Sequence, residues 1–366
     1  MIADSASEGG RGRIGLLVLV VVAGGALLMG ACSPIYVIRA GIAEAKILAA
    51  RRPIPEVVAD PETTDDTRGK LALVLEARAF AIDSLALDVG DSYTSFTRLE
   101  QDTLAMVLSA AYRDRFASKT WWFPIVGRVP YRGYFSLEDA REAQTDLERE
   151  GLDTYLRPTA AFSTLGWFAD PLLSTLLRYD HVELVTSVLH ELSHNHLFVS
   201  GQVRFNESFA TFVGQVGAIE FFCGRVGGGT DTVWCERARA RWRDAQRFGG
   251  FMDELVSELQ SLYADPEIPL ETKLTRREEV FDTFRERFVF EVQPTFEASS
   301  YSGFLTTPLN NATLLSRMLY YHRLDAFDRT YQAHGTDLGA TVAYLARGVG
   351  DADDPFDLLE EPPPGE

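Results

Sequence analysis

The sequence predicts a mainly helical α+β fold, with a small sheet placed before a long helical half. From about residue 180 to residue 348, apolar residues recur at helical spacing, with breaks near 200, 224–230, 264–269 and 301–310. Between residues 120 and 168 the chain is instead aromatic and punctuated by glycine, which is typical of short strands. Strands and helices that occupy separate stretches indicate an α+β arrangement, and no internal repeat is visible.

Residues 1–32 form a predicted targeting segment. Arg11 and Arg13 precede an apolar run over 14–31, which ends in small residues just before Cys32. This order is typical of a bacterial lipoprotein signal, whose cleavage would leave Cys32 as the lipidated first residue. The run is also just long enough to span a bilayer, so an uncleaved membrane anchor is the alternative. Either reading predicts a membrane-anchored protein of the bacterial cell envelope, facing the periplasm.

Residues 33–348 are predicted to form the main domain, in four consecutive parts. The first, 33–119, should be helical over 35–50, 65–85 and 97–117. The second, 120–169, should hold strands in 120–135, 152–157 and 160–168, with a helix that starts at Ser136 in a Ser-x-x-acid pattern. A pair of helices follows in 170–222, and a helical lobe in 223–348. The acidic, proline-rich tail 349–366 has too few apolar residues to pack and is expected to be disordered.

The segment HELSH holds the clearest chemical signal in the chain. His190 and His194 are one helical turn apart, so both imidazoles leave the same helix face and can bind one metal ion. Glu191 is then placed to act as general base toward a water on that metal. Ser200-Gly201 provides a helix break, and the next predicted helix carries Glu207 in its first turn as a third ligand. Two histidines and a carboxylate are a set typical of catalytic Zn²⁺.

The segments HELSH and NESFAT resemble those of the gluzincin metallopeptidases. Over about residues 33–345 the chain is similar to a family of bacterial zinc aminopeptidases that are predicted envelope lipoproteins. Other segments that look like landmarks of this family are Arg51-Arg52-Pro53-Ile54, Ala59-Asp60-Pro61, Trp122-Phe123-Pro124, Tyr131-Arg132-Gly133-Tyr134-Phe135, Ser163-Thr164-Leu165-Gly166-Trp167-Phe168 and Asn310-Asn311-Ala312. The resemblance implies a zincin-like fold and a zinc-dependent hydrolysis of peptide bonds. The chain departs from the family pattern at Ser193, where the family favours alanine, and near Gly214, where it favours an acid.

The resemblance also implies a hydrogen-bond donor for the oxyanion of the reaction, which gluzincins often take from a Tyr or His of the C-terminal lobe. Tyr321 is the first candidate here and His322 the second. In such enzymes an edge strand binds the substrate backbone. Residues 160–168 are the candidate edge, with Gly166 allowing close approach, although an ordinary core strand is the alternative. Asp170 is the nearest acid that could hold the α-ammonium group of an aminopeptidase substrate.

Composition narrows the possible partners. The formal net charge of −18 argues against nucleic acid as a partner. Cys223 and Cys235 flank a glycine-rich turn at 227–229, so a disulfide is expected in an oxidising compartment, with two buried thiols as the alternative. Three functions therefore stay open: a zinc aminopeptidase, a zinc endopeptidase or amidase, and a non-catalytic envelope protein that keeps the fold for binding or assembly.

Overall fold

The computed structural model describes residues 45–359, except 100–104, 124–126, 160–168, 225–228 and 230–231. The predicted targeting segment 1–32 with Cys32, and the predicted edge strand 160–168 with Gly166, lie outside the described residues. Within the described part of the chain, none of the helices combines the length and the apolar character that crossing a membrane requires.

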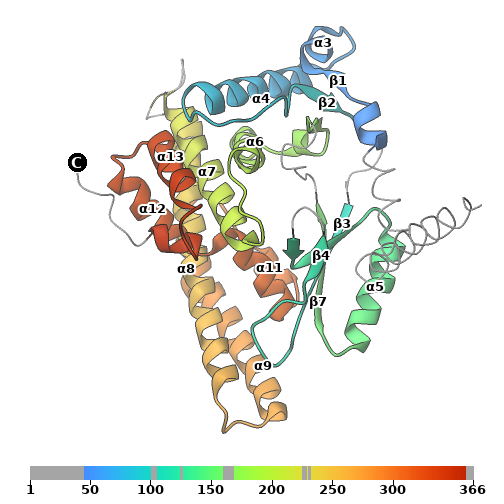
Figure 1. Ribbon diagram of the computed structural model, residues 1–366, viewed down its shortest axis with the longest axis vertical. Coiled ribbons are helices and arrows are strands. Elements are labelled where there is room, and N and C mark those ends of the chain that lie inside the picture. Colours follow the sequence, from blue (N-terminus) through green and yellow to red (C-terminus); the bar gives the residue numbers. More distant parts are fainter. Residues whose placement is uncertain are drawn as a thin grey trace, which may run out of the picture.

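Two consecutive helices in the middle of the chain, α6 and α7, lie at the centre of the described structure (Figure 1). They are packed against α4 on one side and against α8, α11, α12 and α13 on others. The long helices are α4 (Asp65–Asp83), α5 (Leu137–Arg149), α6 (His181–His196), α7 (Val203–Gly224), α8 (Val233–Ala264), α9 (Leu270–Arg287), α11 (Asn311–Tyr321), α12 (Leu324–Ala333) and α13 (Leu338–Gly348). The shorter ones are α3 (Ile54–Ala59), α10 (Gly303–Thr306), the π-helical turn η2 (Phe288–Val292) and the 3-10 turns η1 (Leu176–Arg178), η3 (Gln293–Thr295) and η4 (Pro355–Leu359).

Fully buried aromatic residues of α7 make the helical core. Phe205, Phe209 and Phe212 follow one another at helical spacing and are fully shielded from solvent. Phe327 of α12 lies against Phe205 and Phe212, with ring centroids 6.0 and 5.3 Å away. At the far end of α7, a disulfide joins Cys223 to Cys235 in the first turn of α8. The core and this cross-link together fix α7 relative to the C-terminal lobe.

The strands form three small sheets. In the first, β3 (Ala105–Ala111) lies between β6 (Tyr131–Tyr134) and β7 (Asp153–Thr159), antiparallel to both. In the second, β2 (Ser95–Thr97) joins β1 (Arg52–Pro53) to β8 (Leu172–Leu173), and β4 (Trp121–Phe123) pairs with β5 (Gly127–Val129) in the third. Helix α5 covers one face of the first sheet and α11 the other (Figure 1). Strands β6 and β7 are the two edges of this sheet.

The predicted helix over 97–117 is wrong, because this stretch holds the central strand β3. Its residues, AMVLSAA, have high helix propensity taken singly. They nevertheless bond to β6 and β7 on both sides, and their side chains alternate between α5 and α11. Tertiary packing has overridden the local preference here. The helices predicted over 65–85 and from Ser136 are confirmed, and the Ser136 hydroxyl accepts a hydrogen bond from the Asp139 amide at 3.2 Å.

The expectation of a disordered tail is wrong for residues 351–359. The turn η4 brings Phe356 and Leu359 into the helical core, where both are buried. The ring of Phe356 meets Phe205 edge-on, with ring centroids 5.4 Å apart. Leu358 also packs against this core, and its carbonyl accepts a hydrogen bond from the Tyr344 hydroxyl at 3.1 Å. These few apolar residues anchor the segment, although the surrounding composition is acidic.

Candidate metal centre and catalytic cleft

The metal-binding motif lies in the last turns of α6, a helix whose start and buried face are well defined. The Asp180 carboxylate caps its N-terminus by accepting a hydrogen bond from the Glu183 amide at 3.0 Å. Apolar residues at helical spacing, among them Val185 and Leu192, are fully or almost fully buried. This packing fixes the rotation of α6, so that His190 and His194 leave it toward α7.

The turn between α6 and α7 is held by the side chain of Asn206, the residue before the predicted third ligand. Its amide nitrogen donates to the Val199 carbonyl at 2.8 Å, and its side-chain oxygen accepts from the Val199 amide at 2.9 Å. Gly201 lies in this turn with a φ of 79°, a left-handed conformation that favours glycine. These contacts set where α7 begins and therefore where Glu207 faces α6.

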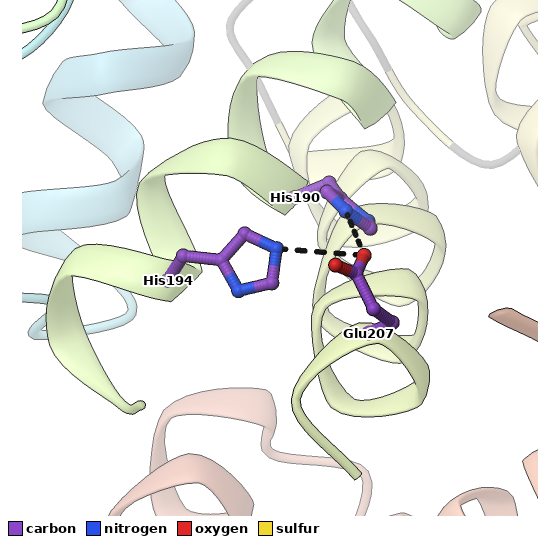
Figure 2. Close-up of side chains that lie close together, drawn as sticks. All are labelled: His190, His194 and Glu207. Carbon is purple, nitrogen blue, oxygen red and sulfur yellow. Dashed lines mark ion pairs between the residues drawn. The ribbon is translucent and has the colours of Figure 1, made fainter. Parts of the chain in front are cut away.

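His190, His194 and Glu207 converge on one point (Figure 2). A carboxylate oxygen of Glu207 is 3.5 Å from His190 Nε2 and 3.7 Å from His194 Nε2. One ligand atom from each of the three residues lies within 4.8 Å of the other two. Ligand atoms about 2.1 Å from a tetrahedral zinc ion are roughly 3.4 Å apart. The two histidines and the carboxylate form a group that could hold a metal ion, and the two histidine–carboxylate distances match the spacing of ligands around a tetrahedral zinc ion.

The charge state of the Glu207 side chain also suits a cation. Burial alone would raise the pKa of Glu207, but hydrogen bonds from His190 and His194 hold that pKa well below its usual range. The side chain stays ionised although only a small part of it is exposed to solvent. A buried carboxylate next to two imidazoles is the kind of site that a divalent metal stabilises.

Gly214 explains one departure from the family pattern. A Cβ atom at this position would lie only 2.6 Å from the Thr186 carbonyl oxygen and 3.2 Å from the Cβ of His190. Helices α6 and α7 touch here backbone to backbone, so an acidic side chain at position 214 has no room.

Among the described residues, the buried Nδ1 atom of His194 has no hydrogen-bond partner. Ser193, the other departure, donates from its hydroxyl to the His190 carbonyl at 2.7 Å.

A cavity of about 360 Å³ opens beside the metal-binding residues. Its lining comes from β7, η1, α6, α7 and α11, and consists of Arg157, Pro158, Thr159, Leu176, Tyr179, Thr186, Ser187, His190, Glu191, Thr211, Gln215, Tyr320 and Tyr321. Burial raises the pKa of Glu191, and the carboxylates of Glu207 and Asp170 add to this, while the two histidines oppose it. Glu191 and His190 line this cavity together.

Asp170 lies close to this site without lining the cavity. It is buried, and its backbone oxygen accepts a hydrogen bond from the Tyr93 amide at 2.8 Å. The charge of its carboxylate contributes to the raised pKa values of Glu191 and Tyr93, after the larger effect of burial. Tyr93 itself has a φ of 61°, which is uncommon for a residue with a side chain and is found mostly where packing enforces it.

The structure places Tyr320, rather than Tyr321, beside the first histidine. The ring centroids of Tyr320 and His190 are 6.1 Å apart, and the Tyr320 hydroxyl accepts a hydrogen bond from Arg157 at 3.2 Å. Tyr321 lines the same cavity, but its hydroxyl is hydrogen-bonded to Tyr301. Burial raises the pKa of Tyr320, so its hydroxyl stays protonated and can donate. Tyr320 is therefore the better placed donor.

His322, the second candidate donor, faces other partners. Its Nδ1 atom is 3.4 Å from a carboxylate oxygen of Asp253 on α8, and its ring lies against Phe356 at a centroid distance of 5.0 Å. Sequence reasoning missed Tyr320 and Arg157. The strand predicted over 152–157 gave part of the signal for Arg157, because side chains two apart on a strand share a face and Arg157 must therefore point the same way as Tyr155. The sequence does not show which of the two faces meets the cleft, so this signal alone could not identify Arg157.

A family model described as "Putative aminopeptidase" matches residues 35–350 of the chain. No curated protein and no solved structure matches it. The matched stretch covers most of the 366 residues and includes the two histidines, the carboxylate and the whole cleft described above. The chain therefore belongs to this putative aminopeptidase family.

Proposed function

We propose that the protein is a zinc-dependent peptidase, and specifically an aminopeptidase. The convergence of His190, His194 and Glu207 on one point, beside a cavity that Glu191 lines, carries this proposal. Membership of the aminopeptidase family supports peptide as the substrate. A site kept only for binding would not need a glutamate that lines the cavity next to the metal ligands.

His190, His194 and Glu207 would hold the zinc ion, which supplies a Lewis acid that activates water and polarises the scissile carbonyl. Glu191 accepts the proton of the attacking water and returns it to the nitrogen of the leaving amine. Its raised pKa suits a group that must take up and release a proton in turn. The Tyr320 hydroxyl donates to the carbonyl oxygen as negative charge develops there.

Metal analysis with matched variants tests the ligand set. We expect about one zinc per purified chain, lost on replacement of His190 or His194 by alanine. His196 lies on the same helix, but its Nδ1 atom accepts a hydrogen bond from the Asp88 amide at 3.0 Å. His196→Ala is therefore the control that should keep its zinc. Equal zinc content in all three variants would refute the assignment.

Digestion of a peptide library tests the reaction. Glu191→Gln should keep zinc but lose nearly all turnover, because an amide cannot accept the proton of water. Tyr320→Phe should lower kcat by about 10²- to 10³-fold, the usual cost of one oxyanion donor, whereas Tyr321→Phe should act far more weakly. Turnover by Glu191→Gln within a few-fold of the parent would favour a role in binding over catalysis.

The aminopeptidase assignment needs an anchor for the α-ammonium group of the substrate. We propose Asp170, whose buried carboxylate lies outside the described cavity lining but close enough to Glu191 for its charge to raise the pKa of Glu191. A peptide with a free amine should be cleaved faster than its N-acetylated form, and Asp170→Asn should remove this difference. Equal cleavage of both peptides by the parent would indicate an endopeptidase instead.

We also propose that the protein works in the cell envelope, anchored through a lipid on Cys32. The basic, apolar and small-residue order that ends at Cys32 supports this. Labelling with palmitate should mark the parent and not Cys32→Ser. Absence of label in the parent would favour an uncleaved membrane anchor.

A further inference from the structure

Arg157 is a feature of the cleft that the proposed mechanism does not use. Among the described lining residues it is the only permanent cation, and Glu191 is the only carboxylate. It projects from β7, where Asp153, Tyr155 and Arg157 share the face away from α5 and alternate with residues that face α5. Pro158 and Thr159, which follow it on the strand, line the cavity too. The guanidinium is thus at the edge of the site where a substrate would lie along β7.

The contacts of Arg157 leave most of its hydrogen-bonding capacity unused within the described structure. Its Nη2 atom donates to the Tyr320 hydroxyl, and its guanidinium carbon lies 5.8 Å from the centre of that ring. No carboxylate of the described residues lies within ion-pair distance of it. The carboxylate of Glu207 acts on it only at longer range and is already bonded to His190 and His194. A guanidinium has five N–H donors, so several of them are available to a molecule in the cavity.

Arg277, a second buried arginine in contact with β7, forms a complete ion pair within the fold. Arg277 donates two hydrogen bonds to the Asp153 carboxylate, at 2.8 and 3.2 Å, and a third to Glu278 at 2.9 Å. That arginine is satisfied within the fold and needs no ligand. Arg157 lies four residues after Asp153 on β7, and its hydrogen-bond partner is the neutral phenol of Tyr320 instead. Placing a cation in a largely buried site without an anion is costly unless one arrives from outside.

We propose that Arg157 binds a carboxylate of the substrate, so that the cleft selects peptides bearing a free carboxylate close to the scissile bond. The proposal rests on the peptidase function proposed above and names its substrate class. Arginine matches the planar geometry of a carboxylate with two parallel hydrogen bonds. A cavity of about 360 Å³ is at the small end of ligand pockets, which suits a short peptide. The carboxylate can come from the C-terminus of a dipeptide or from an acidic side chain next to the cleaved bond.

Matched peptide pairs test this preference and separate the two sources. The first pair is Ala-Ala against Ala-Ala amide, and the second is Ala-Glu amide against Ala-Gln amide. We expect kcat/KM to be about 10- to 100-fold higher for the charged member of at least one pair, which identifies the source. Arg157→Gln should remove this preference by raising KM for the charged peptide, while cleavage of the neutral peptide changes less. Equal cleavage within both pairs by the parent overturns the proposal.

Two further variants separate recognition of a carboxylate from support of Tyr320. If Arg157 only positions the Tyr320 hydroxyl, Arg157→Gln will slow charged and neutral peptides by the same factor, and the proposal fails. Tyr320→Phe should lower kcat for both peptides and keep the preference. Arg157→Lys retains the charge and should keep part of the preference, so it remains informative even if the glutamine variant folds poorly.

Calorimetry on the zinc-loaded Glu191→Gln protein gives a readout that does not depend on turnover. Ala-Ala should bind about 10- to 100-fold more tightly than its amide if the C-terminal carboxylate is the one recognised, and Ala-Glu amide more tightly than Ala-Gln amide otherwise. This difference should vanish when Arg157→Gln is added. Selective binding without hydrolysis of any peptide by the parent would support the carboxylate site and refute the peptidase function. Hydrolysis without selective binding would do the reverse.

Discussion

Replacement of Gly214 by alanine should weaken metal binding although the residue is not a ligand. The added Cβ would lie 2.6 Å from the Thr186 carbonyl oxygen, 3.2 Å from the His190 Cβ and 3.4 Å from the His190 nitrogen. Non-bonded heavy atoms are most stable about 3.5 Å apart, so α6 and α7 must separate by roughly 0.5–1 Å. The obstacle is backbone, which cannot rotate away as a side chain would.

The expected magnitudes follow from this separation. Overpacking costs about 1–3 kcal/mol, and the gain in helix propensity from glycine to alanine offsets about 1 kcal/mol of it. Metal–ligand distances tolerate only about 0.2 Å, and a change in the groups that support the ligands typically costs about 10- to 100-fold in metal affinity. Gly214→Ala should therefore lose zinc affinity by that factor, while the free energy of unfolding falls by at most about 2 kcal/mol.

Two other glycines provide graded controls. A Cβ at Gly217, on the same helix, would meet the tips of leucine side chains and no backbone, the nearest being Leu189 Cδ1 at 2.8 Å. A Cβ at Gly69 on α4 would meet nothing within 4 Å. Zinc affinity, measured by competition with a chelator, should fall in Gly214→Ala, change little in Gly217→Ala and stay unchanged in Gly69→Ala. Thermal melts should show Gly69→Ala stabilised by up to about 1 kcal/mol. Parent-like zinc affinity in Gly214→Ala would refute the reasoning.

Three further predictions concern stability. Asp244 is fully buried and accepts hydrogen bonds from the backbone amides of 297–299, at 2.8 to 3.1 Å. In urea titrations, Asp244→Ala should therefore lower the free energy of unfolding by about 3 kcal/mol. A loss below about 1 kcal/mol would contradict this. Replacing both Cys223 and Cys235 by serine should cost about 3 kcal/mol and remove any effect of reductant on the melting temperature, whereas a double variant as stable as the parent would count against it. Hydrogen bonds from two arginines of α8 lower the pKa of Glu297 to about 2. The ionised Glu297 side chain therefore stabilises the fold fully above the pKa that glutamate has in the unfolded chain, about 4.3, and this stabilisation is lost as the pH falls through about 2. The difference in melting temperature between parent and Glu297→Gln should follow that pH course, and a constant difference from pH 2 to 7 would exclude this origin.

The metal site could be predicted from the sequence because its geometry is local. His190 and His194 are related by one helical turn, and Glu207 follows after a single break at Gly201, so helix periodicity and one turn signal were enough. The same reasoning failed for 105–111, where alanine, methionine and leucine favour a helix taken alone. Their pairing with two other strands depends on residues far away in the sequence.

The choice between Tyr320 and Tyr321 shows a second limit. Neighbouring residues on a helix point about 100° apart, so the rotation of α11 about its axis decides which hydroxyl meets the metal site. That rotation is set by packing, for example by the Ser208 hydroxyl, which donates to the Leu319 carbonyl at 2.9 Å. Arg157 was missed for a similar reason, since a strand predicted from alternation does not say which face meets the cleft. Periodicity predicts the faces of an element, but not which neighbour each face will meet.

The short span between residues 190 and 207 has a consequence for how the protein folds. All three ligands belong to one helical hairpin, whose closing turn is tied by Asn206 to Val199. Closing so small a loop costs little chain entropy, and its contacts can form early because they are close in sequence. A metal ion bound by these three residues would therefore join no distant segments, and the aromatic core around Phe205 holds the lobes together without it. Chelation should leave a folded apoprotein that regains its metal without refolding, unlike a zinc finger, whose fold depends on the ion.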